Sequence, residues 1–310
     1  MRKHASRLLM LSIPTIIEEI LSTLLQYVDT AMVGRLGEEA TAAVSTTTTV
    51  TWLVNSVPGA IGTAMLILIS RAAGAGDKRQ VEKLSQQALF LSVLSGIVLG
   101  GLSVVLSPYI PGWMGAAPGI RAEASRYFFI VSLPMVFRTA SSVLGDALRA
   151  VQDTKTPMLI SVAANILNII MNYILIYPMG LGVAGAAISS AISYAISGIL
   201  MYLVYRRKKE LHWKWDMFSV EPELLKECTA VGSPVLGTSV VSCLGYVVFA
   251  SLVSGMGTTV FAAHSIAVTA ETIFYVPGYG LRTATSALIG TARGEKDDER
   301  SPRWGNSASC

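Results

Sequence analysis

The stretch SIPTIIEEILSTLLQYVDTAMVGRLG, residues 12–37, is long and apolar enough to cross a membrane as a helix. It nevertheless contains three carboxylates, Glu18, Glu19 and Asp29. A carboxylate inside a bilayer costs a few kcal/mol or more, so intramembrane acids are rare and usually functional. The polar positions that share one helical face are Glu18, Ser22, Gln26 and Asp29. We therefore expect a spanning helix whose polar face lines a cavity, with Asp29 binding a cation there.

The composition supports a protein that crosses the membrane many times. Of 310 residues, 52% are hydrophobic and 14% are charged, against about 25% charged in soluble domains. The net charge of +4 is modest and does not indicate a nucleic-acid partner. The cysteines are few and far apart, which indicates neither a disulfide framework nor a metal cluster. No Walker loop, HExxH motif or Ser-His-Asp set is present, so we expect a non-enzyme without a cofactor.

The hydropathy predicts an all-α protein with eight spans. They cover approximately residues 8–33, 46–70, 86–108, 125–147, 157–178, 183–205, 229–253 and 260–290. With a cytoplasmic N-terminus, 19 of the 24 Lys and Arg residues fall in inside segments, Arg149 among them. Basic residues concentrate on the cytoplasmic side of membrane proteins, so this count predicts an N-in orientation in the plasma (inner) membrane.

A shift of the chain by 220 residues reveals an internal repeat. Pro14 falls on Pro234, and Asp77 falls on Asp297. Further pairs are Gly37 with Gly257, Thr63 with Thr283, and Gly74 with Gly294. A unit of six helices repeated in the same orientation is a recurrent transporter design. We expect residues 1–205 to form a complete six-helix N-lobe, residues 206–227 a cytoplasmic linker, and residues 228–300 two helices of a C-lobe. Residues 301–310 are expected to be an unrelated polar tail after a C-terminal truncation.

The fifth predicted span carries a second polar face. Its members are Ser161, Asn165, Asn168 and Asn172. Asparagine amides join membrane helices by hydrogen bonds, and they also offer neutral oxygens to a hard cation. For Asp29 the plain alternative is a carboxylate that snorkels to the membrane surface or caps a turn. Glu19 is expected to pair at a helix contact, as are Arg138 with Asp146 and Glu271 with Arg282.

Five segments together resemble the multidrug and toxic compound extrusion (MATE) family, DinF-like branch. They are P-x14-DTAMVGRLG at 14–37, ISRAAGAGD at 69–77, LRAVQDTKTPM at 148–158, NILNIIMNYILIYPMGLGVAGAAISS at 165–190 and AAHSIAVTAETIFYVPGYG at 262–280. The resemblance implies a fold of twelve helices in two lobes around a central cleft, of which this chain would hold eight. It implies export of organic cations or drugs in exchange for Na⁺ or H⁺.

The resemblance also implies an ion site. Asp29 occupies the place of a central acid in the first helix, and the family's ligands in helices five and six map onto Asn168, Asn172 and Ser190. Asn172 departs from members that carry Asp there, which leaves Asp29 the only ionisable group and the choice between Na⁺ and H⁺ open. No other metal is expected. The residues expected to line the substrate cavity are Glu18, Ser22, Gln26, Asn165 and Glu271.

The resulting hypothesis is a secondary antiporter with Asp29 as its coupling carboxylate. Its expected partners are a small organic cation or drug and the lipid bilayer, with a monomeric state at full length. Three alternatives stay open: a lipid-linked sugar flippase of the same superfamily, a channel, and an inactive fragment. The identity of the substrate does not follow from the sequence.

Overall fold

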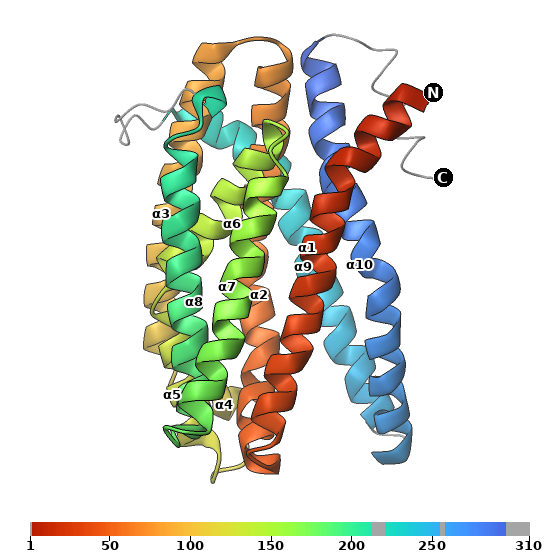
Figure 1. Ribbon diagram of the computed structural model, residues 1–310. Helices are drawn as coiled ribbons and strands as arrows, with labels where there is room; N and C mark the ends of the chain where they lie inside the picture. Colours follow the sequence, from red (N-terminus) through yellow and green to blue (C-terminus); the bar gives the residue numbers. More distant parts are fainter. Residues whose placement is uncertain (1, 212–220, 255–257, 296–310) are drawn as a thin grey trace.

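The structure, a computed structural model, describes residues 2–211, 221–254 and 258–295. Within this part of the chain it is a bundle of long α-helices without strands (Figure 1). In chain order the helices are α1 (Arg2–Gly34), α2 (Glu38–Gly74), α3 (Lys78–Leu106), α4 (Ile110–Trp113), α5 (Arg121–Ser132), α6 (Met135–Ala150), α7 (Lys155–Ile176), α8 (Gly182–Tyr205), the 3₁₀ turn η1 (Lys209–Leu211), α9 (Pro222–Ser254) and α10 (Thr258–Gly294). The all-α expectation is confirmed.

The spans largely follow the hydropathy prediction. Among the described residues, α2, α3, α7, α8 and residues 222–249 of α9 are each long and apolar enough to cross a membrane, and the bent pair α5–α6 makes a sixth span. The two other predicted spans, α1 and α10, do not pass this test. They are helices of 33 and 37 residues that run along the same bundle (Figure 1). The carboxylates of α1 and the charged residues Glu271, Arg282 and Arg293 of α10 lower the mean hydropathy of these two helices.

The fourth predicted span, residues 125–147, is not one straight helix. It is broken between α5 and α6 at Leu133 and Pro134, and the two parts are bent by 51°. Proline lacks the amide hydrogen that a helix needs and its ring clashes with the preceding turn, so the break falls at Pro134. The fourth predicted span is therefore present as a bent pair of helices. Arg149 lies in the last turn of α6 and not in a loop, and it pairs with Glu18 on α1.

Helix boundaries repeat with the period found in the sequence. The bounds of α9 and α10 lie 220 residues after those of α1 and α2 at both ends of both helices. We call helices α1 to α8 the N-lobe and α9 with α10 the partial C-lobe. The helix pairs cross over, since α1 packs on α10 and α2 packs on α9. The first helix of each repeat thus packs on the second helix of the other repeat, as expected when two repeated lobes face each other.

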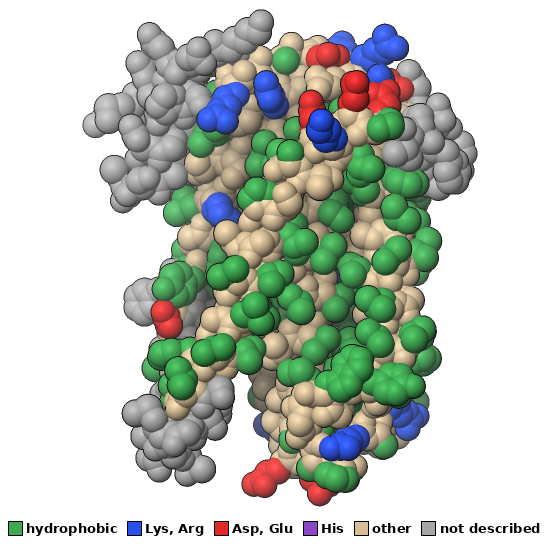
Figure 2. Space-filling view, turned by 180° about the vertical axis from the view of Figure 1, so that it is seen from behind, with side chains coloured by type: hydrophobic (Ala, Val, Ile, Leu, Met, Phe, Trp, Pro, Cys, Tyr) green, Lys and Arg blue, Asp and Glu red, His purple; other side chains and the backbone are tan. Residues whose placement is uncertain are grey.

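The two lobes meet closely at the end of the bundle that carries the N-terminus, which we call the N-terminal end. A side chain at Gly74 would overlap the backbone of Thr291, and one at Gly294 would overlap the backbone of Arg71. These contacts are reciprocal, because both partners are related by the same 220-residue shift. Backbones approach this closely only where small residues sit at the contact. Figure 2 shows that the molecule is hollowed at the other end.

The surface agrees with a membrane environment. Figure 2 shows a band of hydrophobic side chains across the visible face of the bundle, with most charged side chains gathered at its two ends. Large apolar residues are exposed in this band, among them Ile97 at 59% and Val105 at 67% on α3. Exposure of this kind is unfavourable in water and favourable against lipid tails. The prediction of a multi-pass membrane protein is confirmed.

Packing inside the N-lobe depends on α6 lying close to its neighbours. On α8, a side chain at Gly198 would overlap the backbone of Phe137. On α3, Ser92 accepts a hydrogen bond of 2.7 Å from the Thr139 hydroxyl through its carbonyl oxygen. The hydroxyls of Ser141 and Ser197 lie 2.8 Å apart. These contacts fix α6 between α3 and α8.

The close approach at Gly198 gives a first prediction. Gly198→Ala should destabilise the protein by about 2 kcal/mol, because the added methyl group meets backbone that cannot rotate away. The matched control is Gly101→Ala on α3, where a methyl group meets open space and alanine favours the helix. Melting temperatures of both variants in detergent measure the effect. An equal melting temperature for the two variants would contradict the packing described for α8.

The connection between α6 and α7 is held by an ionic cap and gives a second prediction. Burial works to raise the pKa of Asp153, but hydrogen bonds from Lys208 and from Thr156 outweigh it and hold the pKa below its usual value. A lowered pKa in the folded state stabilises the fold above about pH 4, and this contribution disappears as the pH falls through the folded pKa. Asp153→Asn should therefore lower the melting temperature at pH 7 but not near pH 2. A deficit that persists unchanged in acid would contradict this assignment.

Candidate functional site

Asp29 lies where α1 faces α7, at the end of a chain of polar side chains. The Asn172 amide donates a short hydrogen bond to Asp29 Oδ1 and another of 3.2 Å to Asn168 Oδ1. The Asn168 amide in turn donates to the hydroxyls of Ser189 and Ser190 on α8, at 3.2 and 3.3 Å. One carboxylate is thus connected through two amides to two hydroxyls on three helices.

The Asp29 carboxylate determines which groups donate and which accept the hydrogen bonds in this network. An ionised carboxylate only accepts hydrogen bonds, so Asn172 must present its NH₂ group to Asp29. The Asn172 side chain is fully buried, and its Oδ1 has no hydrogen-bond partner among the described residues. A buried amide oxygen without a donor is costly, and a cation or a proton donor beside Asp29 would satisfy it. The donor set fits one small monovalent ion or one proton.

Asp29 has no basic partner in this network. The described residues contain no Lys or Arg within 4 Å of it, and the one polar contact given for its side chain is with Asn172. The same part of the chain contains no group of three or more His, Cys, Asp or Glu side chains that could hold a metal ion. A single carboxylate among neutral oxygens is therefore the ionisable centre of the N-lobe site.

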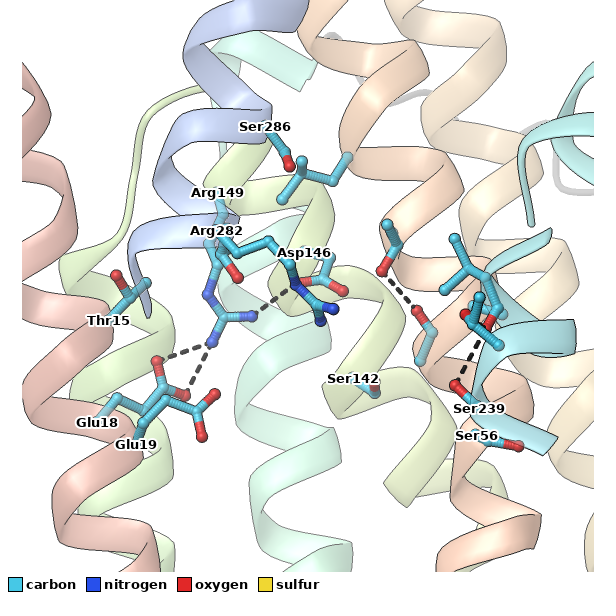
Figure 3. Close-up of a pocket in the computed structure, with 17 residues that line it drawn as sticks. Thr15, Glu18, Glu19, Ser56, Ser142, Asp146, Arg149, Ser239, Arg282 and Ser286 are labelled. Atoms are coloured by element: carbon cyan, nitrogen blue, oxygen red, sulfur yellow. Dashed lines mark hydrogen bonds and ion pairs between the residues drawn. The ribbon is translucent and has the colours of Figure 1, made fainter. Parts of the chain in front are cut away.

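A second cluster of charges lies between the lobes. Arg149 on α6 donates to both oxygens of Glu18 on α1, at 2.8 and 2.7 Å, and to Asp146 Oδ1 at 2.8 Å (Figure 3). The three side chains are only 13 to 17% exposed. We call them the ionic triad. Nη2 of Arg149 reaches both Glu18 oxygens while Nη1 donates to Asp146, so one guanidinium makes charge-assisted hydrogen bonds to two carboxylates.

The triad forms one wall of a pocket of about 310 Å³, which we call the interlobe pocket. Helices α1, α2 and α6 of the N-lobe and α9 and α10 of the partial C-lobe line it. Glu19 and Arg282 add one more charge of each sign, and hydroxyls such as those of Ser142, Thr238 and Ser286 complete the polar lining. Figure 3 shows Glu19 beside Glu18, and Arg282 reaching from α10 toward Asp146.

The family model described as MatE matches residues 14–174 and 234–303, which is most of the chain and includes both lobes. This chain belongs to the MATE family of membrane transporters.

Several MATE relatives are similar along nearly the whole chain. The probable multidrug resistance protein NorM of Thermotoga maritima is 27% identical over 94% of this chain, which spans 64% of that protein's length. The multidrug resistance protein NorM of Vibrio vulnificus is 28% identical over 96% of this chain and 67% of its own. A solved structure entitled "Outward-facing conformation of a multidrug resistance MATE family transporter of the MOP superfamily" superposes with a TM-score of 0.93 at 25% identity, over 98% of this chain and 68% of that one.

The structure brings the four residues of the expected ion site together. Asp29, Asn168, Asn172 and Ser190 form one hydrogen-bonded chain, as the MATE resemblance implied. Their role as ion ligands and the DinF-like branch stay predictions. The network also includes Ser189, which helical spacing on α7 alone could not show, since it lies on α8.

The residues that were expected to line one substrate cavity lie in different places in the structure. Asn165 donates to the Ser22 hydroxyl at 3.2 Å, so this pair continues the contact between α1 and α7. Gln26 is exposed, and Glu271 is exposed on α10, where it accepts from the Tyr275 hydroxyl at 3.1 Å. Glu18 does not face the Asp29 network, because it belongs to the ionic triad. The polar face of α1 therefore serves two different sites.

The expected ion pairs were wrong in three places. Glu18 is the paired glutamate rather than Glu19, for which the described residues offer no ion pair within 4 Å. Asp146 pairs with Arg149, three residues along α6, instead of Arg138, whose guanidinium stacks on the Tyr194 ring at 4.4 Å. Arg282 lies 5.5 Å from the centre of the Tyr279 ring, and it forms no ion pair with Glu271, whose carboxylate accepts from Tyr275. The first error has a geometric cause, since adjacent residues point about 100° apart and α6 happens to approach on the side of Glu18.

Arg149 is the functional residue that sequence reasoning placed wrongly. Its position beside the loop at 151–154 suggested a cytoplasmic cation, but α6 continues to Ala150 and keeps Arg149 buried. The signal that could have found it is charge balance. The carboxylates inside the predicted spans need cations, and Arg149 lies three residues after one of them, Asp146.

Proposed function

We propose that this chain is part of an antiporter that exports small organic cations or drugs in exchange for Na⁺ or H⁺, with Asp29 as the coupling carboxylate. The observation that carries the proposal is the Asp29–Asn172 contact, in which an intramembrane carboxylate is held by neutral groups and faces an unsatisfied buried amide oxygen. The names of its relatives, which are multidrug resistance proteins, support the substrate class. The chain spans about two thirds of their length.

Helix α1 provides the connection between ion binding and movement. It carries Asp29, which is bonded to α7, and Thr15, whose hydroxyl donates to the Gly280 carbonyl oxygen on α10 at 3.2 Å. Ion binding or protonation at Asp29 weakens its hydrogen bond from Asn172 and so loosens α1 from the N-lobe. Pro14 lies between these contacts and the N-terminus, at a position where helices bend easily. Coupling arises because the ion binds the two arrangements of α1 with different affinity.

The distribution of basic residues indicates which end of the bundle faces the cytoplasm. This orientation in turn tells which side of the membrane is closed in the structure. With the N-terminus in the cytoplasm, the close contact of Gly74 and Gly294 seals the cytoplasmic side, and the hollow in Figure 2 opens outward. We place the protein in the plasma membrane as a monomer. The division at residues 206–227 belongs to the same proposal. Residues 212–220 of the expected linker and all of the expected tail, 301–310, lie outside the described residues.

A lipid-linked sugar flippase is less compatible with the charges between the lobes. Such substrates carry phosphate groups and require a basic cavity. The interlobe pocket is lined by the carboxylates of Glu18, Glu19 and Asp146 against the guanidiniums of Arg149 and Arg282, which leaves a formal excess of one negative charge. A pocket of this sign attracts cations and repels phosphates.

Efflux measurements test the proposal. The chain is expressed in cells deficient in drug efflux, beside the full-length Thermotoga relative, and loss of preloaded ethidium is followed under imposed Na⁺ or proton gradients. We expect export that accelerates when one of these gradients is applied. Export that is indifferent to both gradients would contradict an antiporter, and conductance without substrate movement would indicate a channel.

A further inference from the structure

The interlobe pocket contains one carboxylate and one guanidinium that are not paired. Glu18, Asp146 and Arg149 satisfy one another in the ionic triad. Among the described residues, the Glu19 carboxylate makes no hydrogen bond or ion pair. Arg282 makes no ion pair there, and its guanidinium lies 5.5 Å from the centre of the Tyr279 ring. Both side chains line the pocket, and they come from opposite lobes. Glu19 is on α1 of the N-lobe, and Arg282 is on α10 of the partial C-lobe.

The negative charges in this pocket are not balanced by positive ones. The triad alone carries one net negative charge, and Glu19 adds a second. Arg282 contributes one positive charge, but it forms no ion pair with these carboxylates. Arg282 reaches into the pocket from α10 toward Asp146 (Figure 3). An uncompensated carboxylate at membrane depth is costly, so a mobile cation beside Glu19 would lower the energy of this arrangement.

The size and chemistry of the pocket fit a small organic cation. A volume of about 310 Å³ is at the lower end of the range for small-molecule sites. Hydroxyl groups such as those of Thr15, Ser56 and Ser239 surround the charges and suit a polar ligand better than a purely apolar one. The pocket is also formed by both lobes, so its shape must change when the lobes separate at the N-terminal end.

We propose that the interlobe pocket is a second cation-binding site, separate from Asp29, in which Glu19 receives the ammonium group of a small organic cation and Arg282 acts as an internal competitor for that place. With the N-terminal end closed, Arg282 is held near Glu19 and Asp146 and disfavours the bound cation. When the lobes part, α10 carries Arg282 away and the cation binds more tightly. This inference rests on the proposed export function, for which it names a loading site and a means of release.

Because Glu19 and Arg282 carry opposite charges, their removal should change cation binding in opposite directions. Binding of labelled tetraethylammonium to the purified chain in lipid nanodiscs is measured at equilibrium for Glu19→Gln and Arg282→Gln. Removing Glu19 should weaken binding by about tenfold, and removing Arg282 should strengthen it by a similar factor. A merely structural role would not produce shifts of opposite sign. Any result in which the two variants fail to move in opposite directions overturns the proposal.

Further variants separate charge from shape. Glu19→Ala and Arg282→Met should reproduce the two shifts, and melting temperatures report whether each variant is folded. The control for removal of one carboxylate is Glu38→Gln, because Glu38 is exposed at the start of α2 and lies outside the pocket. It should leave binding unchanged. A shift in this control equal to that of Glu19→Gln would overturn the assignment to Glu19.

The same assay distinguishes this inference from the proposed function. Asp29 does not line the interlobe pocket, so Asp29→Asn removes no contact of the bound tetraethylammonium and can change its binding only through the position of α1. Abolished binding in Asp29→Asn together with unchanged binding in Glu19→Gln would mean a single site at Asp29 and overturn the inference. If Asp29→Asn kept ion-driven export while Glu19 and Arg282 variants shifted binding in opposite directions, the role of Asp29 would be wrong and the second site would stand.

Discussion

Asp29→Asn should reduce ion-driven export by about 100-fold while the protein remains folded. Coupling between an ion and a substrate is typically worth about 1–3 kcal/mol, or roughly 5- to 150-fold, and Asp29 is the one ionisable group in its network. Asparagine has nearly the same shape and its oxygen can still accept the hydrogen bond from Asn172. The change therefore removes the charge and leaves the contact between α1 and α7 in place. The measurement is the initial rate of ethidium efflux under an imposed gradient, compared with the unmodified chain.

Two further variants serve as controls for Asp29→Asn. Glu38→Gln also removes one carboxylate, but from an exposed position at the start of α2, and it should not change the export rate. Asn172→Ala should lower the rate less than Asp29→Asn, because it removes the hydrogen-bond donor and leaves the ionisable group. Ion-driven export by Asp29→Asn at the rate of the unmodified chain would show that coupling lies elsewhere.

The sequence was sufficient to predict the fold because its signals were local and repeated. Apolar stretches of about 20 residues define spans wherever they occur, and the alignment of Pro14 on Pro234 and Asp77 on Asp297 predicted that helices would recur after 220 residues. The helix bounds in the structure recur at that interval. The bend in the fourth span falls at Pro134, and proline inside a span is the usual signal of a kink.

The sites were only partly predictable, because they depend on which helices approach each other. Helical spacing correctly placed Asn168 and Asn172 on one face of α7, and the family resemblance brought Asp29 and Ser190 to it. Spacing on one helix could not show that Glu18 would meet α6 while Asp29 met α7. It also could not show which arginine would reach Glu18, because contacts of high sequence separation leave no local signal.

The separation of the two sites on α1 has a physical consequence. Asp29 lies eleven residues after Glu18, about 16 Å along the helix at 1.5 Å per residue. A charge change at Asp29 is therefore too distant to act strongly on the interlobe pocket through the electric field alone. Communication between them must pass through movement of α1, which contacts α7 at one site and α6 and α10 at the other.

Arg149→Met should be the most destabilising single change among the charged residues. The substitution removes the common partner of Glu18 and Asp146 and leaves two carboxylates, each less than a fifth exposed, without a cation. Breaking a buried ion pair by removing one partner typically costs about 3–5 kcal/mol. We expect a large fall in melting temperature in detergent. The control is Arg206→Met, which removes an exposed arginine at the end of α8 and should have little effect.

A triple variant tests whether the loss comes from the uncompensated charges or from the shape of Arg149. In Glu18→Gln/Asp146→Asn/Arg149→Met the whole ionic triad becomes neutral, and replacement of a complete buried ion cluster by neutral residues is often nearly neutral in stability. We therefore expect the triple variant to regain most of the melting temperature lost in Arg149→Met. If the triple variant is as unstable as the single one, the hydrogen bonds and packing of Arg149 hold α1 against α6. If it recovers stability but loses export, the triad is retained for its charges in the interlobe pocket and not for the strength it gives the fold.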